Sequence, residues 1–250
     1  MNKLSVIIIA GNEERNIRDC LKSASFADEI IVVDSFSTDK TVEIAREYTP
    51  KVYQKKWEGY AVQKRYSLEM ATHEWVMSLD ADERITPALK DEILGLMKNE
   101  PQYDGYYIPR KTYFNGKWIK SCGWYPGYQL RLFRKSKTTV TTRLVHEGFE
   151  VDGKTGRMKG DIDHFTHESI EQTIKKINHY SSLEAEEKWQ RKHVSGLSII
   201  LHPIAAFFNH YIVKRGITDG VEGLMISVFH AMTNLMTYMK MYERKKNGKQ

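Results

Sequence analysis

The sequence feature that most constrains the fold is an apolar run near the start of the chain, from Leu4 to Ala10, broken only by Ser5. A continuous run of this kind, rich in β-branched residues, is typical of a strand buried on both faces of a parallel sheet. Similar runs cover Glu29 to Val33 and Trp75 to Asp80, and segments with helical spacing separate them. This alternation predicts an α/β fold: a mainly parallel sheet flanked by helices.

Polar residues follow these predicted strands at the point where each strand ends. Asp34 ends the second run, and Asp80, Ala81 and Asp82 end the run that begins at Trp75. The carboxyl ends of parallel strands are where open α/β sheets bind ligands. Two carboxylates in an Asp-x-Asp pattern can hold a hard divalent cation such as Mg²⁺ or Mn²⁺, whose remaining ligands a diphosphate supplies. The alternative is an acidic turn with Asp82 or Glu83 in solvent.

After Pro101 the pattern changes to alternation, which predicts antiparallel hairpins. The strongest signal is Asn115-Gly116 between the runs 107–114 and 117–121, because Asn-Gly favours a tight hairpin turn. A second hairpin is expected from Glu147 to Val151 with a return through Met158.

The last third of the chain predicts helices, with apolar stretches from Ile199 to Val213 and from Leu224 to Met239. Basic residues flank the first stretch, as in helices that lie in a membrane interface, although packing of both helices on the domain remains an alternative. We therefore expect a catalytic domain over residues 1–168, with halves 1–104 and 105–168, and a helical extension over 169–250.

Composition and short motifs limit the classes of function that we expect for this chain. A net charge of +6 suits an anionic partner such as a nucleotide diphosphate or an acidic lipid surface. The basic residues are dispersed and form no nucleic-acid-binding motif, so we expect no nucleic acid partner. Cys20 and Cys122 have no paired spacing, which argues against a disulfide framework or a zinc cluster and suits a reducing cytoplasm. No Gly-rich dinucleotide fingerprint and no P-loop lysine follow the first strand, which argues against NAD and ATPase chemistry.

With these pieces in place, the chain resembles the family 2 glycosyltransferases of GT-A fold, a Rossmann-like mixed sheet with acceptor-side hairpins. The nearest subgroup looks like the lipopolysaccharide core β-glucosyltransferases. The resemblance covers most of the chain, and the segments that carry it are Val6 to Glu14, Val32 to Thr41, Trp57 to Tyr60 with Gln63-Lys64, Leu79 to Glu83, Val145 to Glu147, Asp163 to Phe165 and Gly216 to Gly223.

The resemblance implies roles at individual positions. Asp82 and His164 would bind the metal, with His167 as the alternative histidine. Glu147 would be the general base, with His146 as its rival. The positions implied in nucleotide-sugar binding are Ala10, Glu13, Asp34, Lys64, Asp80 and Ala81. The family often carries a hydroxyl residue where this chain has Ala10, so base recognition there would rely on backbone atoms.

The resemblance further implies an inverting, metal-dependent transfer of a hexose, with glucose from UDP-glucose as the expected donor. The acceptor would be a lipopolysaccharide or lipooligosaccharide core or a related lipid-linked glycan. Separately, the apolar stretch with basic flanks predicts a cytoplasmic protein attached peripherally to the inner leaflet of the cytoplasmic membrane. One alternative is a sugar-1-phosphate nucleotidyltransferase, which normally opens on a Gly-rich loop with a basic residue. Another is an inactive, membrane-peripheral protein that binds nucleotide sugars; Asp82, Glu147 and His164 together argue against it.

Overall fold

The structure is a computed structural model that describes residues 2–141, 148–167, 169–191 and 194–247. The described residues form two compact units. The first contains residues 2–111, 127–141 and 148–164, and the second contains 112–126 and the described residues from 165 onward. The segment 112–126 therefore interrupts the first unit in sequence but belongs to the second.

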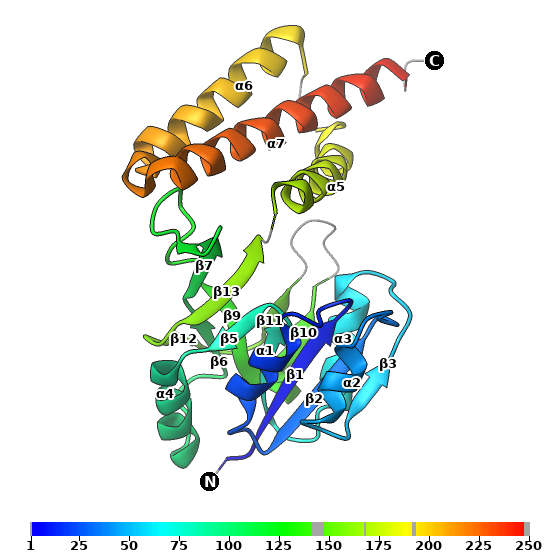
Figure 1. Cartoon of the computed structure of the whole chain (residues 1–250), viewed down its shortest axis with the longest axis vertical. Helices are drawn as coiled ribbons and strands as arrows, with labels where there is room; N and C mark the ends of the chain where they lie inside the picture. The colour runs from blue at the N-terminus through cyan, green and yellow to red at the C-terminus, as the bar shows by residue number, and fades with distance from the viewer. Residues whose placement is uncertain (1, 142–147, 168, 192–193, 248–250) are drawn as a thin grey trace. The chain divides into compact units, whose positions relative to one another are not determined.

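In the described part of the chain, the first unit is built on a seven-stranded sheet of order β12-β6-β9-β4-β1-β2-β3 (Figure 1). Strands β3, β2, β1 and β4 run parallel to one another, β9 runs antiparallel to both β4 and β6, and β12 runs parallel to β6. The expected mixed, mainly parallel sheet is confirmed. The strands are β1 (Leu4–Ala10), β2 (Glu29–Asp34), β3 (Val52–Gln54), β4 (Trp75–Asp80), β6 (Gly105–Ile108), β9 (Gln129–Arg134) and β12 (Thr155–Arg157).

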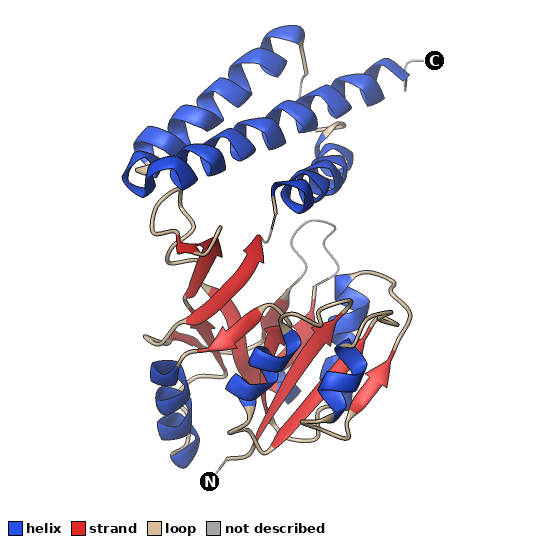
Figure 2. Ribbon diagram, viewed as in Figure 1, coloured by secondary structure: helices blue, strands red, loops and turns tan. Residues whose placement is uncertain are grey.

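Helices pack on both faces of this sheet (Figure 2). Residues of β1 alternate between the faces, so that Val6 and Ile8 pack against one set of helices while Ile7 and Ile9 pack on the other side. The first face is covered by α1 (Ile17–Ala24), α2 (Thr41–Arg46) and α4 (Pro87–Lys98), and the second by α3 (Tyr60–Met70). Burial on both faces explains the continuous apolar runs in the sequence.

Two shorter pairings complete the first unit. Strand β5 (Glu83–Ile85) follows β4 directly and pairs antiparallel with β13 (Ile162–His167), with Glu83 opposite His164. Strand β10 (Thr138–Val140), after the 3₁₀ turn η1 (Lys135–Lys137), pairs antiparallel with β11 (Phe149–Val151). The predicted second hairpin is wrong. The two strands on either side of Asp152-Gly153 pair with different partners, because β11 joins β10 while β12 joins the edge of the central sheet at β6.

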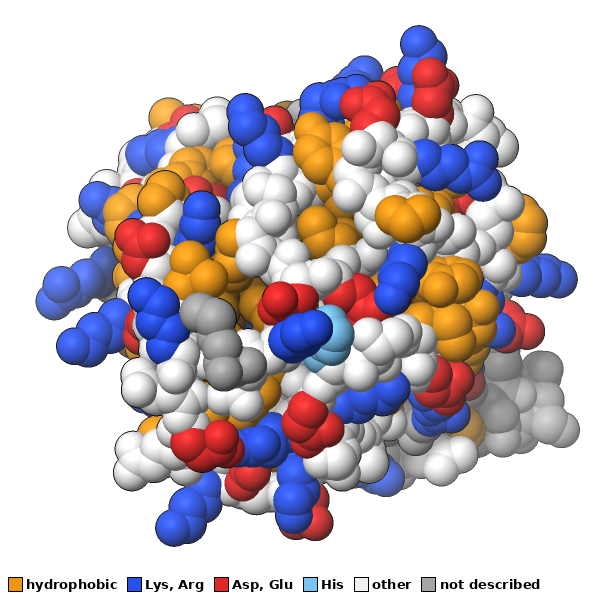
Figure 3. Space-filling view, turned by 90° about the horizontal axis from the view of Figure 1, so that it is seen from below, with side chains coloured by type: hydrophobic (Ala, Val, Ile, Leu, Met, Phe, Trp, Pro, Cys, Tyr) orange, Lys and Arg blue, Asp and Glu red, His pale blue; other side chains and the backbone are white. Residues whose placement is uncertain are grey.

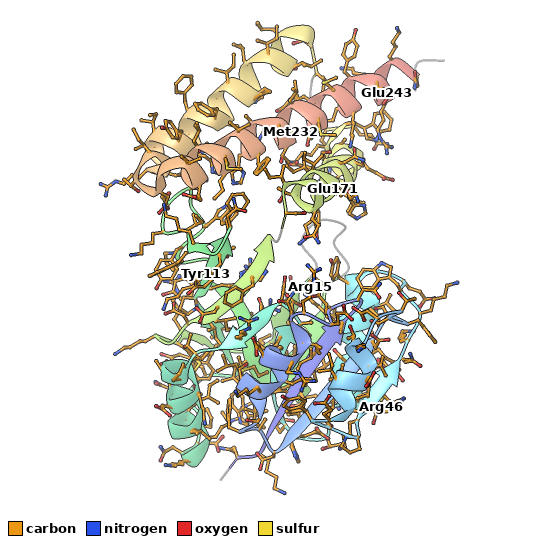
Figure 4. All side chains as sticks on the ribbon, in the orientation of Figure 1. Arg15, Arg46, Tyr113, Glu171, Met232 and Glu243 are labelled. Atoms are coloured by element: carbon orange, nitrogen blue, oxygen red, sulfur yellow. The ribbon has the colours of Figure 1, made fainter. Side chains whose placement is uncertain are left out.

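The second unit contains the predicted Asn-Gly hairpin. Strand β7 (Arg110–Phe114) pairs with β8 (Lys117–Trp118) around Asn115 and Gly116, whose φ angles of 50° and 76° are those of a type I′ turn. Tyr113 stacks on Phe165 with ring centroids 4.6 Å apart (Figure 4). This aromatic side chain of the hairpin is therefore engaged in packing.

Helices make up the rest of the second unit, and α5 and α6 both pack against α7 (Figure 1). The buried carboxylate of Asp219 joins them to the hairpin segment, accepting from the backbone N–H groups of Lys120 and Ser121 at 3.0 and 2.9 Å and from the Ser121 hydroxyl at 2.6 Å. The helices are α5 (Ile170–Lys188), α6 (Gly196–Phe208), the π-helical turn η2 (Asn209–Val213), the 3₁₀ turn η3 (Gly216–Asp219) and α7 (Gly220–Asn247).

One helical run in the described chain, Gly196–Val213, is long and apolar enough to cross a membrane by length and composition. It spans 18 residues with a mean hydropathy of 1.4, and none of these residues is buried in the protein. Among the exposed large apolar side chains of the run, Leu197 at 64% and Val213 at 74% are the most exposed.

Candidate active site

The carboxyl ends of β1, β2 and β4 lie side by side, as the sequence pattern predicted. Ala10 is the register partner of Asp34, and Ile9 is the partner of Asp80. Asp34 and Asp80, which end β2 and β4, therefore lie at one edge of the sheet beside Ala10. The candidate residues on other elements, such as Lys64 on α3 and His164 on β13, are positioned separately.

Asp34 is fully buried at the end of β2. One of its carboxylate oxygens, Oδ2, accepts from the backbone N–H of Ser37 at 2.9 Å and lies 3.5 Å from the amide nitrogen of Gln54, while Oδ1 accepts from the Ser37 hydroxyl. The carboxylate thus fixes the turn that follows the strand. Its expected contact with a nucleotide base stays a prediction.

Asp80 ends β4 in a buried network of charged side chains with Arg131 and Glu83. Its Oδ2 accepts from Nη2 of Arg131 at 2.6 Å, and the same nitrogen donates to Oε1 of Glu83, also at 2.6 Å. The other oxygen of Glu83 accepts from the backbone N–H of Asp80 at 3.0 Å. Glu83 is 0% exposed, so the alternative that placed this side chain in solvent is wrong.

The charges of this network keep Asp80 ionised. Burial alone would raise the pKa of the Asp80 carboxyl, but the Arg131 guanidinium, with Lys64 and then Arg110, outweighs it and holds that pKa well below its usual range. Burial would in turn lower the pKa of Arg131, and the charges of Asp80 and Glu83 raise it instead. A permanently charged carboxylate is therefore present at the strand end at neutral pH.

Asp82 lies in the turn after β4, and its Oδ2 is 3.4 Å from Nε2 of His164. The pairing of β5 with β13 brings them together by setting His164 opposite the residue that follows Asp82. The two side chains are only 18% and 10% exposed. The side chain of His167, the alternative ligand, lies outside the described residues.

Asp82 and His164 fit a divalent cation. They offer one oxygen and one nitrogen donor close together, and both side chains are largely shielded from solvent. Within the described residues, no group of three His, Cys, Asp or Glu side chains gathers to hold a metal. The remaining ligands of a bound ion would come from a diphosphate and water, as is common for Mg²⁺.

Ala10 and Glu13, two further residues expected to contact the nucleotide sugar, both make hydrogen bonds within the protein. The carbonyl of Ala10 accepts from the backbone N–H of Ser35 at 2.9 Å. Glu13 accepts from the Asn16 amide at 3.0 Å, and its own backbone N–H donates to Thr41.

Lys64 and Ala81 differ in exposure. Lys64 is half-buried with its ammonium 5.9 Å from the centre of the Tyr60 ring. The Ala81 methyl group packs in the core, at 4% exposure, so that only its backbone could face a ligand.

Two expected residues of the acceptor half fall outside the described structure. Glu147 and its rival His146 lie within 142–147, so the structure does not describe the expected general base. The assignment of a base stays a prediction from the sequence.

Arg131 is the functional candidate that sequence reasoning missed. In the sequence it lies between Leu130 and Leu132 in an alternating strand, where a charged residue reads as solvent-facing. In the structure it is only 4% exposed. The available signal was the apolar Leu132-Phe133 pair beside it, which marks a strand buried on both faces.

The distribution of charged side chains on the described surface is relevant to nucleic-acid binding. On the face shown in Figure 3, Lys and Arg side chains are interspersed with Asp and Glu. On this face the basic side chains do not gather into the stripe that a nucleic-acid-binding surface presents.

Comparison with known proteins places the chain in a family. The family model described as Glycosyl transferase family 2 matches residues 5–150, more than half of the chain. The chain belongs to this family. It is a family 2 glycosyltransferase, and the matched residues include β2 and β4 with their terminal carboxylates, Asp34 and Asp80.

Relatives of this glycosyltransferase match it over nearly its whole length. An uncharacterized glycosyltransferase of Rickettsia typhi, RT0209, is 32% identical, covering 97% of this chain and 88% of its own. The lipopolysaccharide core biosynthesis glycosyltransferase LpsC of Rhizobium meliloti is 29% identical, covering 96% of this chain and 92% of its own.

A solved structure supports the fold. The crystal structure of S. aureus TarS 1-349 in complex with UDP-GlcNAc has a TM-score of 0.51 and 16% sequence identity, covering 98% of this chain and 92% of that chain. With the family match, it confirms the expected GT-A fold.

Proposed function

We propose that this family 2 glycosyltransferase is an inverting, metal-dependent enzyme that moves a hexose from a UDP-sugar, with UDP-glucose as the first candidate, onto a lipopolysaccharide or related lipid-linked core. The observation that carries the proposal is the pair Asp82–His164, 3.4 Å apart, beside the ionised Asp80 at the carboxyl end of the sheet. The similarity to LpsC supports the acceptor class, and the UDP-GlcNAc bound in TarS supports a uridine donor.

The proposal assigns each group one task. Asp82 and His164 would hold Mg²⁺ or Mn²⁺, which as a Lewis acid stabilises a diphosphate leaving group. Asp80 would accept from a hydroxyl of the donor ribose or sugar, and Lys64 would lie near the diphosphate. Asp34 would accept from the base. Glu147 would take the proton of the acceptor hydroxyl as a general base.

We further propose that the protein lies on the cytoplasmic leaflet through the exposed apolar side of α6 and η2. Leu197, Leu201, Phe208 and Val213 on this side are each more than half exposed. Lys214 and Arg215 follow directly, which suits an anionic lipid surface. A peripheral position is favoured over a spanning one because the neighbouring helix α7 is covered by the polar α5, with Lys240 bonded to Asn178 at 2.7 Å.

The function is tested by thermal unfolding with a panel of nucleotide sugars, each with and without Mn²⁺ or Mg²⁺. A donor at one hundred times its Kd stabilises the native state by about 2.7 kcal/mol. For a protein of this size that is a rise in Tm of roughly 5–10 °C. We expect the rise with a UDP-sugar and metal together, followed by transfer to a lipid-linked acceptor.

The Asp82→Ala variant tests the metal assignment in the same assay. It should fold normally, lose transfer, and give a Tm shift that no longer depends on Mn²⁺. Asp91→Ala, on the exposed side of α4, is the matched control and should behave as the unchanged protein. A metal-dependent shift of full size in Asp82→Ala would contradict the assignment. Pyrophosphate release from a nucleoside triphosphate and a sugar phosphate would instead support a nucleotidyltransferase.

A further inference from the structure

The two carboxylate oxygens of Asp80 have different surroundings. Oδ2 accepts from Arg131 Nη2 at 2.6 Å, whereas Oδ1 has no hydrogen-bond partner in the described structure. The guanidinium therefore occupies one side of the carboxylate. An ionised carboxylate oxygen is a strong acceptor, and leaving one buried and unpaired costs free energy unless a ligand supplies a donor.

The same guanidinium nitrogen also fixes the turn that carries Asp82. Nη2 of Arg131 reaches Oε1 of Glu83 at 2.6 Å, and Oε2 of Glu83 accepts from the backbone N–H of Asp80 at 3.0 Å. These contacts close a ring from the Asp80 backbone through Glu83 and Arg131 to the Asp80 side chain. The ring spans the turn that contains Ala81 and Asp82. The orientation of the Asp80 side chain and the backbone path of this turn therefore both depend on these contacts.

The fold alone gives little reason for a charged residue here. Arg131 lies in the middle of β9, between Leu130 and Leu132, with its Nε buried and unpaired in the described structure. Removing a guanidinium and two carboxylates from water costs several kcal/mol per ion, and buried ion pairs are often no more stabilising than apolar residues of similar volume. Stability alone therefore gives a weak reason for this network. The orientation that it imposes on the Asp80 carboxylate gives a better one.

We propose that Arg131 is a positioning residue for the donor: it holds Asp80 by Oδ2, so that Oδ1 faces a hydroxyl of the nucleotide sugar. Glu83 is the internal anchor of this arrangement and does not itself contact the donor. The inference rests on the proposed function, because it assumes that a nucleotide sugar binds at Asp80. It adds a residue from β9, which runs antiparallel to β4, to a site that already contains the ends of parallel strands and His164 of β13.

The test compares donor binding in two variants. Arg131→Lys keeps the buried positive charge, but its nitrogen is one bond closer to the backbone and cannot reproduce the planar fork. The double variant Arg131→Gln/Glu83→Gln removes one charge of each sign and leaves the net charge unchanged. Binding of UDP-glucose with Mn²⁺ is measured by calorimetry, and Tm without ligand reports the fold. Arg134→Lys is the matched control, because Arg134 lies on the same strand but pairs with Glu100 and Asp104.

We expect Arg131→Lys and the double variant each to weaken donor binding by about tenfold or more, which corresponds to one lost hydrogen bond to a charged group. Arg134→Lys should bind as the unchanged protein does. If the double variant binds the donor within twofold of the unchanged protein, Arg131 serves only to balance Glu83 and the inference is overturned. Should the double variant fail to fold, unchanged donor binding in Arg131→Lys overturns it equally.

A failure of the proposed function gives a different result. In that case the unchanged protein itself binds no nucleotide sugar, whatever residue stands at position 131. Weakened binding in the Arg131 variants, against a clear signal from the unchanged protein, therefore supports both statements together.

Discussion

An acceptor hydroxyl becomes a nucleophile when a base takes its proton, and Glu147 is the residue expected to do this. Glu147→Gln keeps the shape and hydrogen-bonding capacity of the side chain but cannot accept the proton. We expect the transfer rate to fall by about 10²–10⁴, the usual contribution of a general base, while donor affinity barely changes. Single-turnover transfer and donor binding, measured on the same preparation, separate the two effects.

His146 provides the comparison for this prediction. The sequence pattern predicts an extended segment, in which neighbouring side chains point to opposite faces, so we expect only one of the two to serve the acceptor. A nearby cation also discourages a histidine from accepting a proton. His146→Ala should therefore retain transfer. An inactive His146→Ala beside a near-normal Glu147→Gln would assign the role to the histidine.

Glu29 is a second residue whose ionisation the structure constrains. Burial would raise its pKa, but the Lys51 ammonium with the Ser5 hydroxyl and Thr72 outweighs it and lowers the pKa from 4.5 to about 2. The native state thus binds fewer protons than the unfolded state between those values. The contribution of Glu29 to stability is complete above about pH 4.5 and is lost as the pH falls toward 2.

This difference corresponds to about 3 kcal/mol at neutral pH. Denaturant unfolding between pH 6 and pH 2.5 should show a steeper loss of stability in the unchanged protein than in Glu29→Gln. Glu47→Gln is the control, because Glu47 pairs with Arg18 at the exposed surface. Parallel stability curves for the unchanged protein and Glu29→Gln would contradict the prediction.

Two side chains connect η3 to the hairpin segment: the Asp219 carboxylate, and the Lys117 ammonium, which donates to the Asp219 carbonyl. The Asp219 carboxylate accepts from two backbone N–H groups and one hydroxyl on that segment. Asp219→Ala would leave these donors without their acceptor in a buried place, and each such loss costs about 1–3 kcal/mol. We expect a clear fall in Tm. Glu222→Ala, which removes only a partly exposed pair with Lys117, should lower Tm much less.

The elements themselves were largely predictable, because local patterns encode them. The strands β1, β2 and β4 are continuous apolar runs, α4 begins at Thr86-Pro87, and the Asn-Gly turn marks its hairpin. The pairing of β12 with β6 was not predictable, because it joins strands about fifty residues apart and no local pattern records it. The three-residue strand β5 was too short to show a period.

The site was predictable where it depends on strand ends and not where it depends on pairing. Asp34, Asp80 and Asp82 end runs that any parallel sheet would bring together. The contact of His164 with Asp82 requires β13 to lie beside β5, and the burial of Arg131 requires β9 to lie beside β4. Both depend on long-range antiparallel pairing. Sequence reasoning reached His164 only through family resemblance.

For the molecule as a whole, the exposed apolar side of α6 predicts binding to membranes. We expect the protein to float with liposomes that contain anionic lipid at low salt, and to be released as salt screens the basic residues. Leu201→Asp/Phe208→Asp should abolish flotation, because both side chains are more than half exposed in this run. Ile174→Asp, an exposed apolar position on α5, is the control. Protein that stays unbound at low salt would contradict the membrane proposal.

The assignment of residues 112–126 to the second unit has a consequence for the timing of synthesis. Ser121 leaves the ribosome 98 residues before Asp219, its acceptor. At roughly 5–20 residues per second, the segment waits about 5–20 s for that partner. During this interval the first unit becomes complete in sequence, while Phe114 and Ile119 still lack Ile226, the α7 residue they pack against in the native protein. The nascent chain therefore carries an unsatisfied apolar segment until α7 has been synthesised, and exposed apolar surface of this kind is what chaperones bind.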